Sequence, residues 1–155
     1  MPLIVEDGTG KPDAQTYATE AELTQFATDR GIILKKQPSV LLLLASDYLE
    51  AQKYRESRLV EGQALSWPRA VYGLPSAIKR AQLMLAVLAD AMDLMPSLPV
   101  QTSASVIKRV KVDVIEKEYA DVQQLRTAPV FPPVDALLKD YKSGGTFGSA
   151  KVLRR

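Results

Sequence analysis

The chain has 155 residues, of which 46% are hydrophobic and 25% are charged, as in one ordinary soluble globular domain. It contains no cysteine and no histidine, which excludes disulfides, thiolate nucleophiles, cysteine zinc sites and a Ser-His-Asp triad. The net charge of +2 is too small to indicate a nucleic-acid partner by itself. No group of carboxylates or lysines forms an active-site pattern, so we expect a protein that is not an enzyme and uses no cofactor or metal.

The first 17 residues predict an irregular lead-in, because glycine and proline recur in them. Residues 6–11 superficially resemble a phosphate-binding loop. Val5, however, stands where that motif needs its first glycine, and Pro12 follows the lysine. We therefore interpret this segment as a turn.

A first helix is predicted to begin after Thr19, because Glu22 three positions later completes a capping box. Leu23 and Phe26 contribute to its apolar face, and Gly31 is a suitable stop at its C-terminal end.

A second helix is predicted from about residue 38 to about residue 58, with Pro38 in the first turn, and a loop from 59 to 74 follows it. The third helix, about 75–95, is apolar around nearly its whole circumference, which predicts burial in a core or between subunits. The polar residues of its first turns are expected to face water: Lys79, Arg80 and Gln82. Four side chains are expected to anchor the core: Tyr48, Trp67, Met84 and Leu88.

The longest apolar runs, residues 40–45 and 83–89, are far shorter than the roughly 20 residues that span a bilayer. The first residues also lack the basic start of a signal peptide. We therefore expect no membrane partner and synthesis in the cytoplasm.

Between residues 105 and 120 the apolar period changes to two, which predicts a β-hairpin or an extended arm. An isolated hairpin is only marginally stable, so helices or another subunit must cover it. Its members are expected to face a neighbouring subunit or a channel: Lys108, Arg109, Val110, Lys111, Val112 and Val114. The cations among them could equally form a solvated strand face.

A short helix is predicted at about 134–141, before a glycine-rich tail. Residues 142–155 carry four cations and no carboxylate, which leaves 16 cations against 18 carboxylates, a net charge of −2, in residues 1–141. The fold class that we expect is mainly α: a bundle of three main helices and a short C-terminal helix, with a protruding β element. Residues 1–141 would form one domain, and 142–155 a flexible basic tail.

Aromatic and basic residues alternate between positions 48 and 69: Tyr48, Lys53, Tyr54, Arg55, Arg58, Trp67 and Arg69. One interpretation is a platform for single-stranded nucleic acid, on which bases stack beside a basic groove. The alternative, which base rates favour, is that the rings pack in the core while the cations lie in solvent.

Five segments, in their order along the chain, resemble the head–tail connector (adaptor) proteins of tailed bacteriophages, a group also described as DnaT-like single-stranded DNA-binding proteins. They are residues 3–8, 45–50, 64–69, 74–81 and 132–138. Asp113 departs from the pattern, because a glycine turn is expected near it. The resemblance implies a helical bundle that assembles into a ring, usually of twelve copies, beneath the portal of the virion.

In that family the ring extends the DNA channel and carries the downstream neck or tail-completion protein. We therefore also expect non-specific contact of this chain with the packaged double-stranded DNA. The C-terminal segment commonly docks on the portal protein. The corresponding residues here are Phe147, Lys151, Val152, Leu153, Arg154 and Arg155. The sequence thus leaves two hypotheses: a structural virion protein, and a single-stranded nucleic-acid-binding protein.

Overall fold

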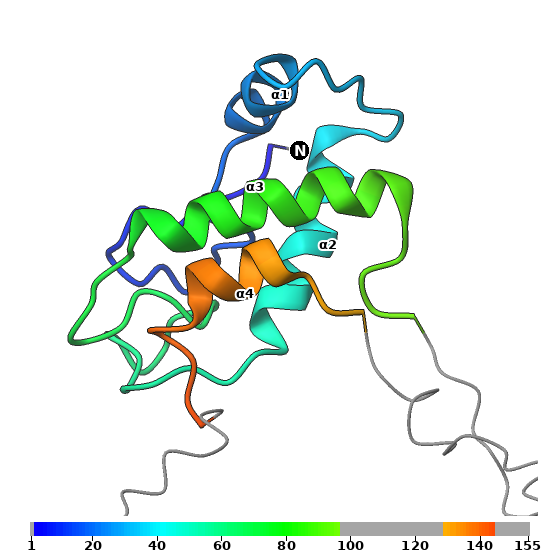
Figure 1. Ribbon diagram of the computed structural model, residues 1–155. Helices are drawn as coiled ribbons and strands as arrows, with labels where there is room; N and C mark the ends of the chain where they lie inside the picture. The colour runs from blue at the N-terminus through cyan, green and yellow to red at the C-terminus, as the bar shows by residue number, and fades with distance from the viewer. Residues whose placement is uncertain (1, 97–128, 145–155) are drawn as a thin grey trace, which may run out of the picture. The chain divides into compact units, whose positions relative to one another are not determined.

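Four α-helices make up the regular structure of the part that the computed structural model describes, residues 2–96 and 129–144. They are α1 (Glu20–Thr28), α2 (Pro38–Glu50), α3 (Ser76–Ala91) and α4 (Pro132–Leu138), labelled in Figure 1. The predicted mainly α bundle is therefore confirmed. The predicted β element at 105–120 and residues 145–155 of the predicted tail lie outside the described residues.

The chain divides into two units, one of residues 1–94 and 131–155 and one of residues 95–130. All four helices belong to the first unit, and only the two residues at each end of the second unit are described. Among the described helices, none is long and apolar enough to cross a membrane.

Helix α1 begins and ends where the sequence predicted. The Thr19 hydroxyl accepts a hydrogen bond from the Glu22 N–H at 3.1 Å, and the Glu22 carboxylate accepts one from the Thr19 N–H at 2.7 Å. Gly31 ends the helix with a φ of +66°, and its N–H donates to the Thr28 carbonyl at 3.0 Å. Glycine suits this position because a Cβ disfavours the left-handed backbone.

Helix α2 ends at Glu50, eight residues before the predicted end, so that part of the prediction was wrong. Downstream, the N–H of Arg55 donates to the carbonyl of Tyr141, and the carbonyl of Lys53 accepts from the N–H of Ser143. Glu56 has a φ of +65°, which a helix cannot contain. Partners almost 90 residues away in the sequence therefore draw this segment out of the helix.

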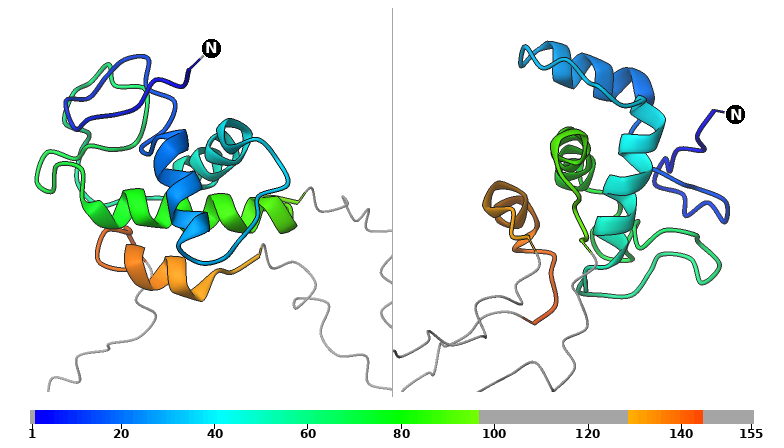
Figure 2. Two further views of the ribbon diagram at one scale, coloured as in Figure 1. Left: turned by 90° about the horizontal axis from the view of Figure 1, so that it is seen from above. Right: turned by 90° about the vertical axis from the view of Figure 1, so that its right-hand side faces the viewer.

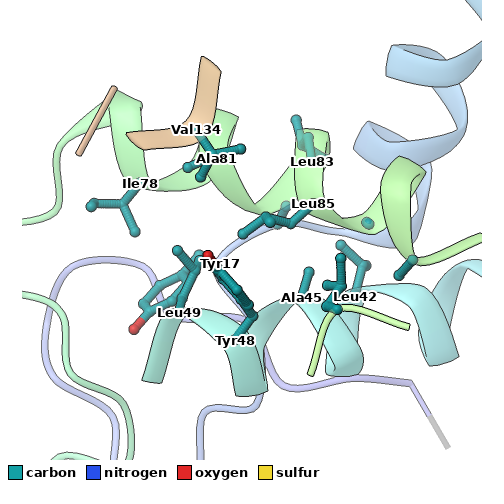
Figure 3. Close-up of a cluster of buried hydrophobic side chains, with 14 of the residues drawn as sticks. Tyr17, Leu42, Ala45, Tyr48, Leu49, Ile78, Ala81, Leu83, Leu85 and Val134 are labelled. Carbon is teal, nitrogen blue, oxygen red and sulfur yellow. The ribbon is translucent and has the colours of Figure 1, made fainter. Parts of the chain in front are cut away.

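Helix α3 is the central helix of the bundle, since it contacts each of the other three. Figures 1 and 2 show it between α2 on one side and α4 on the other. Its buried residues include Ile78, Ala81 and Leu85, which meet Leu42 and Leu49 of α2 in the core drawn in Figure 3. The apolar circumference of α3 is thus explained by neighbours on several sides.

Gln82 does not face water, and the prediction for this residue was wrong, because its side chain is fully buried. Its amide nitrogen donates to the Thr16 hydroxyl at 2.7 Å, the Ser46 hydroxyl at 2.7 Å and the Leu42 carbonyl at 3.1 Å. Its amide oxygen accepts from the Tyr17 N–H at 3.0 Å. Burial of the amide is tolerated because these bonds replace the ones that it makes to water.

Of the other expected residues, Arg80 is exposed, whereas Lys79 is only partly exposed and forms an ion pair of 2.9 Å with Glu22. Two of the four expected anchors, Tyr48 and Trp67, are buried, with 8% and 0% of their surface exposed. Met84 and Leu88 are partly buried and pack against the core.

Candidate nucleic-acid interface

Residues 51–75 connect α2 to α3 without a helix, and an aromatic cluster holds them in place. The cluster consists of Tyr54, Trp67, Tyr72 and Tyr141. The Trp67 ring meets Tyr54 at a centroid distance of 5.2 Å and Tyr141 at 5.4 Å, both edge to face. Edge-to-face pairs stabilise the fold beyond their buried area. The buried rings of this loop therefore extend the hydrophobic core of the helices.

The buried rings of this region cannot serve as the stacking platform that the sequence suggested. Tyr54 and Tyr48 are each 8% exposed and Trp67 is fully buried. Tyr48 packs edge to face on Phe131, with ring centroids 5.4 Å apart. These three rings are packed in the core, as the alternative interpretation of the sequence proposed.

The Glu50 carboxylate ties the loop to the helices. One of its oxygens accepts from the Tyr17 hydroxyl at 2.5 Å, and the other accepts from the Ser66 N–H at 2.8 Å. The Tyr17 hydroxyl in turn accepts from the Trp67 N–H at 3.2 Å. Burial, together with the adjacent Glu50, raises the pKa of Tyr17 well above its usual range, so this hydroxyl stays protonated.

The same loop carries four cations, which we call the basic rim: Lys53, Arg55, Arg58 and Arg69. The first three are exposed, and Arg69 is partly exposed. Arg55 Nε donates to the Lys142 carbonyl at 2.9 Å, and Arg69 Nη1 donates to the Glu56 carbonyl at 2.7 Å. Within residues 2–96 and 129–144, none of the four forms an ion pair with a carboxylate. Arg58 Nη1 likewise donates to the Gln63 carbonyl at 3.3 Å, so backbone carbonyls fix three arginines without neutralising their charge.

Arg58 and Arg69 face each other across an antiparallel bridge. The Leu59 N–H donates to the Pro68 carbonyl at 3.1 Å, and the Ala70 N–H donates to the Ser57 carbonyl at 3.0 Å. Partial burial and the neighbouring Arg58 lower the pKa of the Arg69 guanidinium, while Glu50 opposes this. Arginine nevertheless keeps its charge at neutral pH, so two positive charges are held close together. An anion between them would relieve their repulsion.

The Arg69 guanidinium lies over two rings of the cluster, 5.4 Å from the Tyr54 centroid and 5.7 Å from the Trp67 centroid. Cation–π contacts of this kind orient a guanidinium and leave its edge able to bind an acceptor. The aromatic cluster therefore holds Arg69 of the basic rim in position. The rings and the cations alternate in this part of the sequence.

Tyr72 is the residue of this region that the sequence analysis missed. It lies in a tight turn closed by two hydrogen bonds between Arg69 and Gly73, of 2.9 and 2.8 Å, with Gly73 at a φ of +62°. The Tyr72 side chain is 38% exposed and that of its neighbour Val71 is 67% exposed. The signal was a Tyr-Gly pair in a loop, which predicts a turn with an aromatic tip.

In the loop at residues 6–11 a carboxylate of the chain itself accepts the backbone N–H groups, which agrees with the interpretation of this segment as a turn. The buried Glu6 carboxylate accepts from the N–H groups of Gly8, Gly10 and Lys11 at 2.8–2.9 Å. The N–H donors that an anion would need are therefore already bonded. No group of acidic residues in the described ranges could hold a metal ion.

The other predicted site residues lie outside the described residues. They are the six of the β element, Lys108, Arg109, Val110, Lys111, Val112 and Val114, and the six of the tail, Phe147, Lys151, Val152, Leu153, Arg154 and Arg155. Lys142 and Ser143, at the start of the predicted tail, are held against residues 53–55.

Fold and site together define a small, mainly α protein with a basic loop face supported by buried rings. A family model described as "Putative DnaT-like ssDNA binding protein" matches residues 1–155, and the chain therefore belongs to that family. Neither the curated proteins nor the solved structures contain a match to this chain.

Proposed function

We propose that this protein binds single-stranded nucleic acid along the basic rim. The observation that carries the proposal is that one loop presents four cations, three of them bound to backbone carbonyls, without carboxylate partners in the described part of the chain. The family description supports the same function. Unneutralised arginines fixed by backbone carbonyls suit the phosphate oxygens of a nucleic-acid backbone.

Binding of this kind releases counterions and weakens as salt rises. A single strand that contacts all four cations gives a slope of log K against log [salt] of about −3, from roughly −0.7 per phosphate. The rim is separate from the helical packing, so its charges can be removed in variants that keep the core.

Fluorescence anisotropy with a labelled oligothymidine between 50 and 300 mM salt tests the proposal. We expect the double variant Arg55→Gln/Arg58→Gln to bind at least about tenfold more weakly at low salt, with a slope reduced by about 1.4. The matched control is Arg80→Gln/Lys139→Gln, which removes two exposed cations outside the rim. Absence of binding by the unaltered chain at 50 mM salt, or an equal loss in the control, would contradict the proposal.

Exposed apolar side chains on α2 favour a second candidate, the structural virion role. Val40, Leu43 and Leu44 are 44%, 36% and 39% exposed, and their i, i+3, i+4 spacing places them on one face of the helix. Exposed apolar faces of this kind are typical of contacts with a partner.

The second candidate is a non-enzymatic ring of probably twelve copies at the head–tail interface of a virion. It would contact the portal protein through the tail residues named above, as well as a downstream neck or tail-completion protein and the packaged double-stranded DNA. Electron cryo-microscopy of purified necks tests it, and absence of the chain from the portal vertex would rule it out. Deletion of residues 145–155 should leave the fold intact and abolish attachment to the portal.

One pair of variants separates the two candidates. Leu43→Ser/Leu44→Ser should keep oligonucleotide binding and reduce incorporation into particles if the chain is a ring subunit. If the rim binds nucleic acid, Arg55→Gln/Arg58→Gln should weaken oligonucleotide binding and leave incorporation into particles unchanged.

A further inference from the structure

We infer that Tyr72 is the residue on which an unpaired base stacks, so that the rim prefers single strands with accessible bases. This inference rests on the proposed function and deepens it. A basic rim alone binds any nucleic-acid backbone, whereas an exposed ring beside it adds a contact that only an unstacked base can make.

Exposure singles out Tyr72 among the rings. Within residues 2–96 and 129–144, every other aromatic side chain is less exposed than Tyr72. Phe26, which is partly buried, is covered by the Arg30 guanidinium at 3.5 Å from its centroid. Tyr54 and Trp67 are buried in the aromatic cluster.

The contacts of Tyr72 hold the ring in place without stacking on it. Its ring meets Tyr141 at 5.3 Å and 88°, and Trp67 at 6.4 Å and 51°. Neither neighbour is parallel to Tyr72, and more than a third of the side chain remains exposed. The closed turn from Arg69 to Gly73 fixes the backbone beneath it, so little conformational freedom is lost when a base stacks.

The position of Tyr72 relative to the rim supports a combined contact. Arg69 begins the same turn and lies over Trp67, which Tyr72 also contacts. Tyr141, the second neighbour of Tyr72, accepts the backbone hydrogen bond of Arg55 through its carbonyl. The Tyr72 ring thus contacts Trp67 and Tyr141. Trp67 contacts Arg69, and Tyr141 accepts from the backbone of Arg55. A phosphate on the rim and a base on Tyr72 are therefore compatible with one nucleotide chain.

The experiment compares two labelled 12-mers with the same number of phosphates, one of thymidine and one of abasic spacers. The unaltered chain should bind oligothymidine about tenfold more tightly, since one stacked base contributes a factor of about 5 to 150. Tyr72→Ala and Tyr72→Leu should bind both 12-mers with the lower affinity. Tyr72→Phe should keep the preference, as should Val71→Ala, an exposed neighbour in the same turn.

The outcomes distinguish this inference from the function on which it rests. Salt-dependent binding without any preference for thymidine overturns the role of Tyr72 and leaves the rim proposal intact. A preference that survives in folded Tyr72→Ala and Tyr72→Leu, with circular dichroism as the check, also overturns it. If neither 12-mer binds the unaltered chain at low salt, both the rim proposal and this inference fail.

Discussion

The helical body, α1 to α4, and the loop of residues 51–75 achieve order in different ways. In the body, packed apolar faces enclose the polar side chains of Gln82 and Ser46, and the hydrogen bonds of Gln82 are all made internally. In the loop, a buried indole and side-chain bonds to backbone carbonyls replace regular secondary structure.

This difference has a functional consequence. In the body, the buried polar side chains of α2 and α3 bond to each other, while Arg80 of α3 is exposed. In the loop, backbone carbonyls hold Arg55 and Arg58 while both side chains remain exposed. An irregular segment whose rings pack into the core can therefore present charged side chains in fixed positions.

The largest effect should come from removing the centre of the loop. Trp67→Ala is expected to lower the free energy of unfolding by about 3–5 kcal/mol, because it leaves a cavity among the rings that it contacts. Urea unfolding followed by far-ultraviolet circular dichroism measures this. Val71→Ala, in the exposed part of the loop, should change it by less than about 0.5 kcal/mol. A loss below about 1 kcal/mol for Trp67→Ala would show that the loop contributes little to stability.

The next effect concerns the body. Gln82→Leu is expected to cost about 2–3 kcal/mol, because the Tyr17 N–H is left buried without its acceptor and two hydroxyls lose a donor. Arg80→Leu, at an exposed site two residues away, is the control in the same unfolding assay. Equal stability of Gln82→Leu and the unaltered chain would mean that apolar packing alone fixes this register.

A smaller effect is expected at the start of α1. Thr19→Ala should cost about 1 kcal/mol, because it removes the acceptor for the Glu22 N–H from the capping box. Thr24→Ala, within the same helix, provides the comparison in thermal unfolding. A larger loss for Thr24→Ala than for Thr19→Ala would contradict the capping role.

The smallest effect is expected in the irregular N-terminal segment that contains Asp7. Local polar hydrogen bonds hold this segment in place, as they do in the loop. Hydrogen bonds from Thr9, and then Lys11, lower the pKa of the Asp7 carboxyl from 3.8 to about 2. A lowered folded-state pKa stabilises the fold above pH 3.8, and this contribution disappears as the pH falls toward 2. Unfolding midpoints of the unaltered chain and Asp7→Asn should therefore converge between pH 4 and pH 2. Asp13→Asn is the control, and a difference that persists at pH 2 would contradict the assignment.

Local signals in the sequence were sufficient for the starts of α1, α2 and α3, whereas α4 begins at Pro132, two residues before its predicted start. The Thr19–Glu22 capping box and Pro38 and Pro75 all mark true boundaries, since each acts within one turn of the helix. The end of α2 was not predictable in this way, because its cause is the pairing of residues 53–55 with 141–143.

The site was predictable only in part for the same reason. The alternation of rings and cations at 48–69 located the region, and composition favoured burial of Tyr48 and Trp67. Nothing local distinguished the exposed Tyr72 from the buried Tyr54, because their exposure depends on how each ring packs against Trp67 and, for Tyr72, against the distant Tyr141. Gln82 was misjudged because its partners lie 36 to 66 residues away.

The pairing of residues 141–143 with 53–55 also bears on how the molecule is made. Helices α1 to α3 precede residues 141–143 in the chain. They therefore leave the ribosome before the residues that pair with 53–55. Contacts that span almost 90 residues form late, because closing so long a segment costs more entropy than local pairing. The bond from Arg55 to the Lys142 carbonyl is thus expected to form after α1 to α3 have folded, whereas the bond from Arg69 to the Glu56 carbonyl spans only 13 residues and can form earlier.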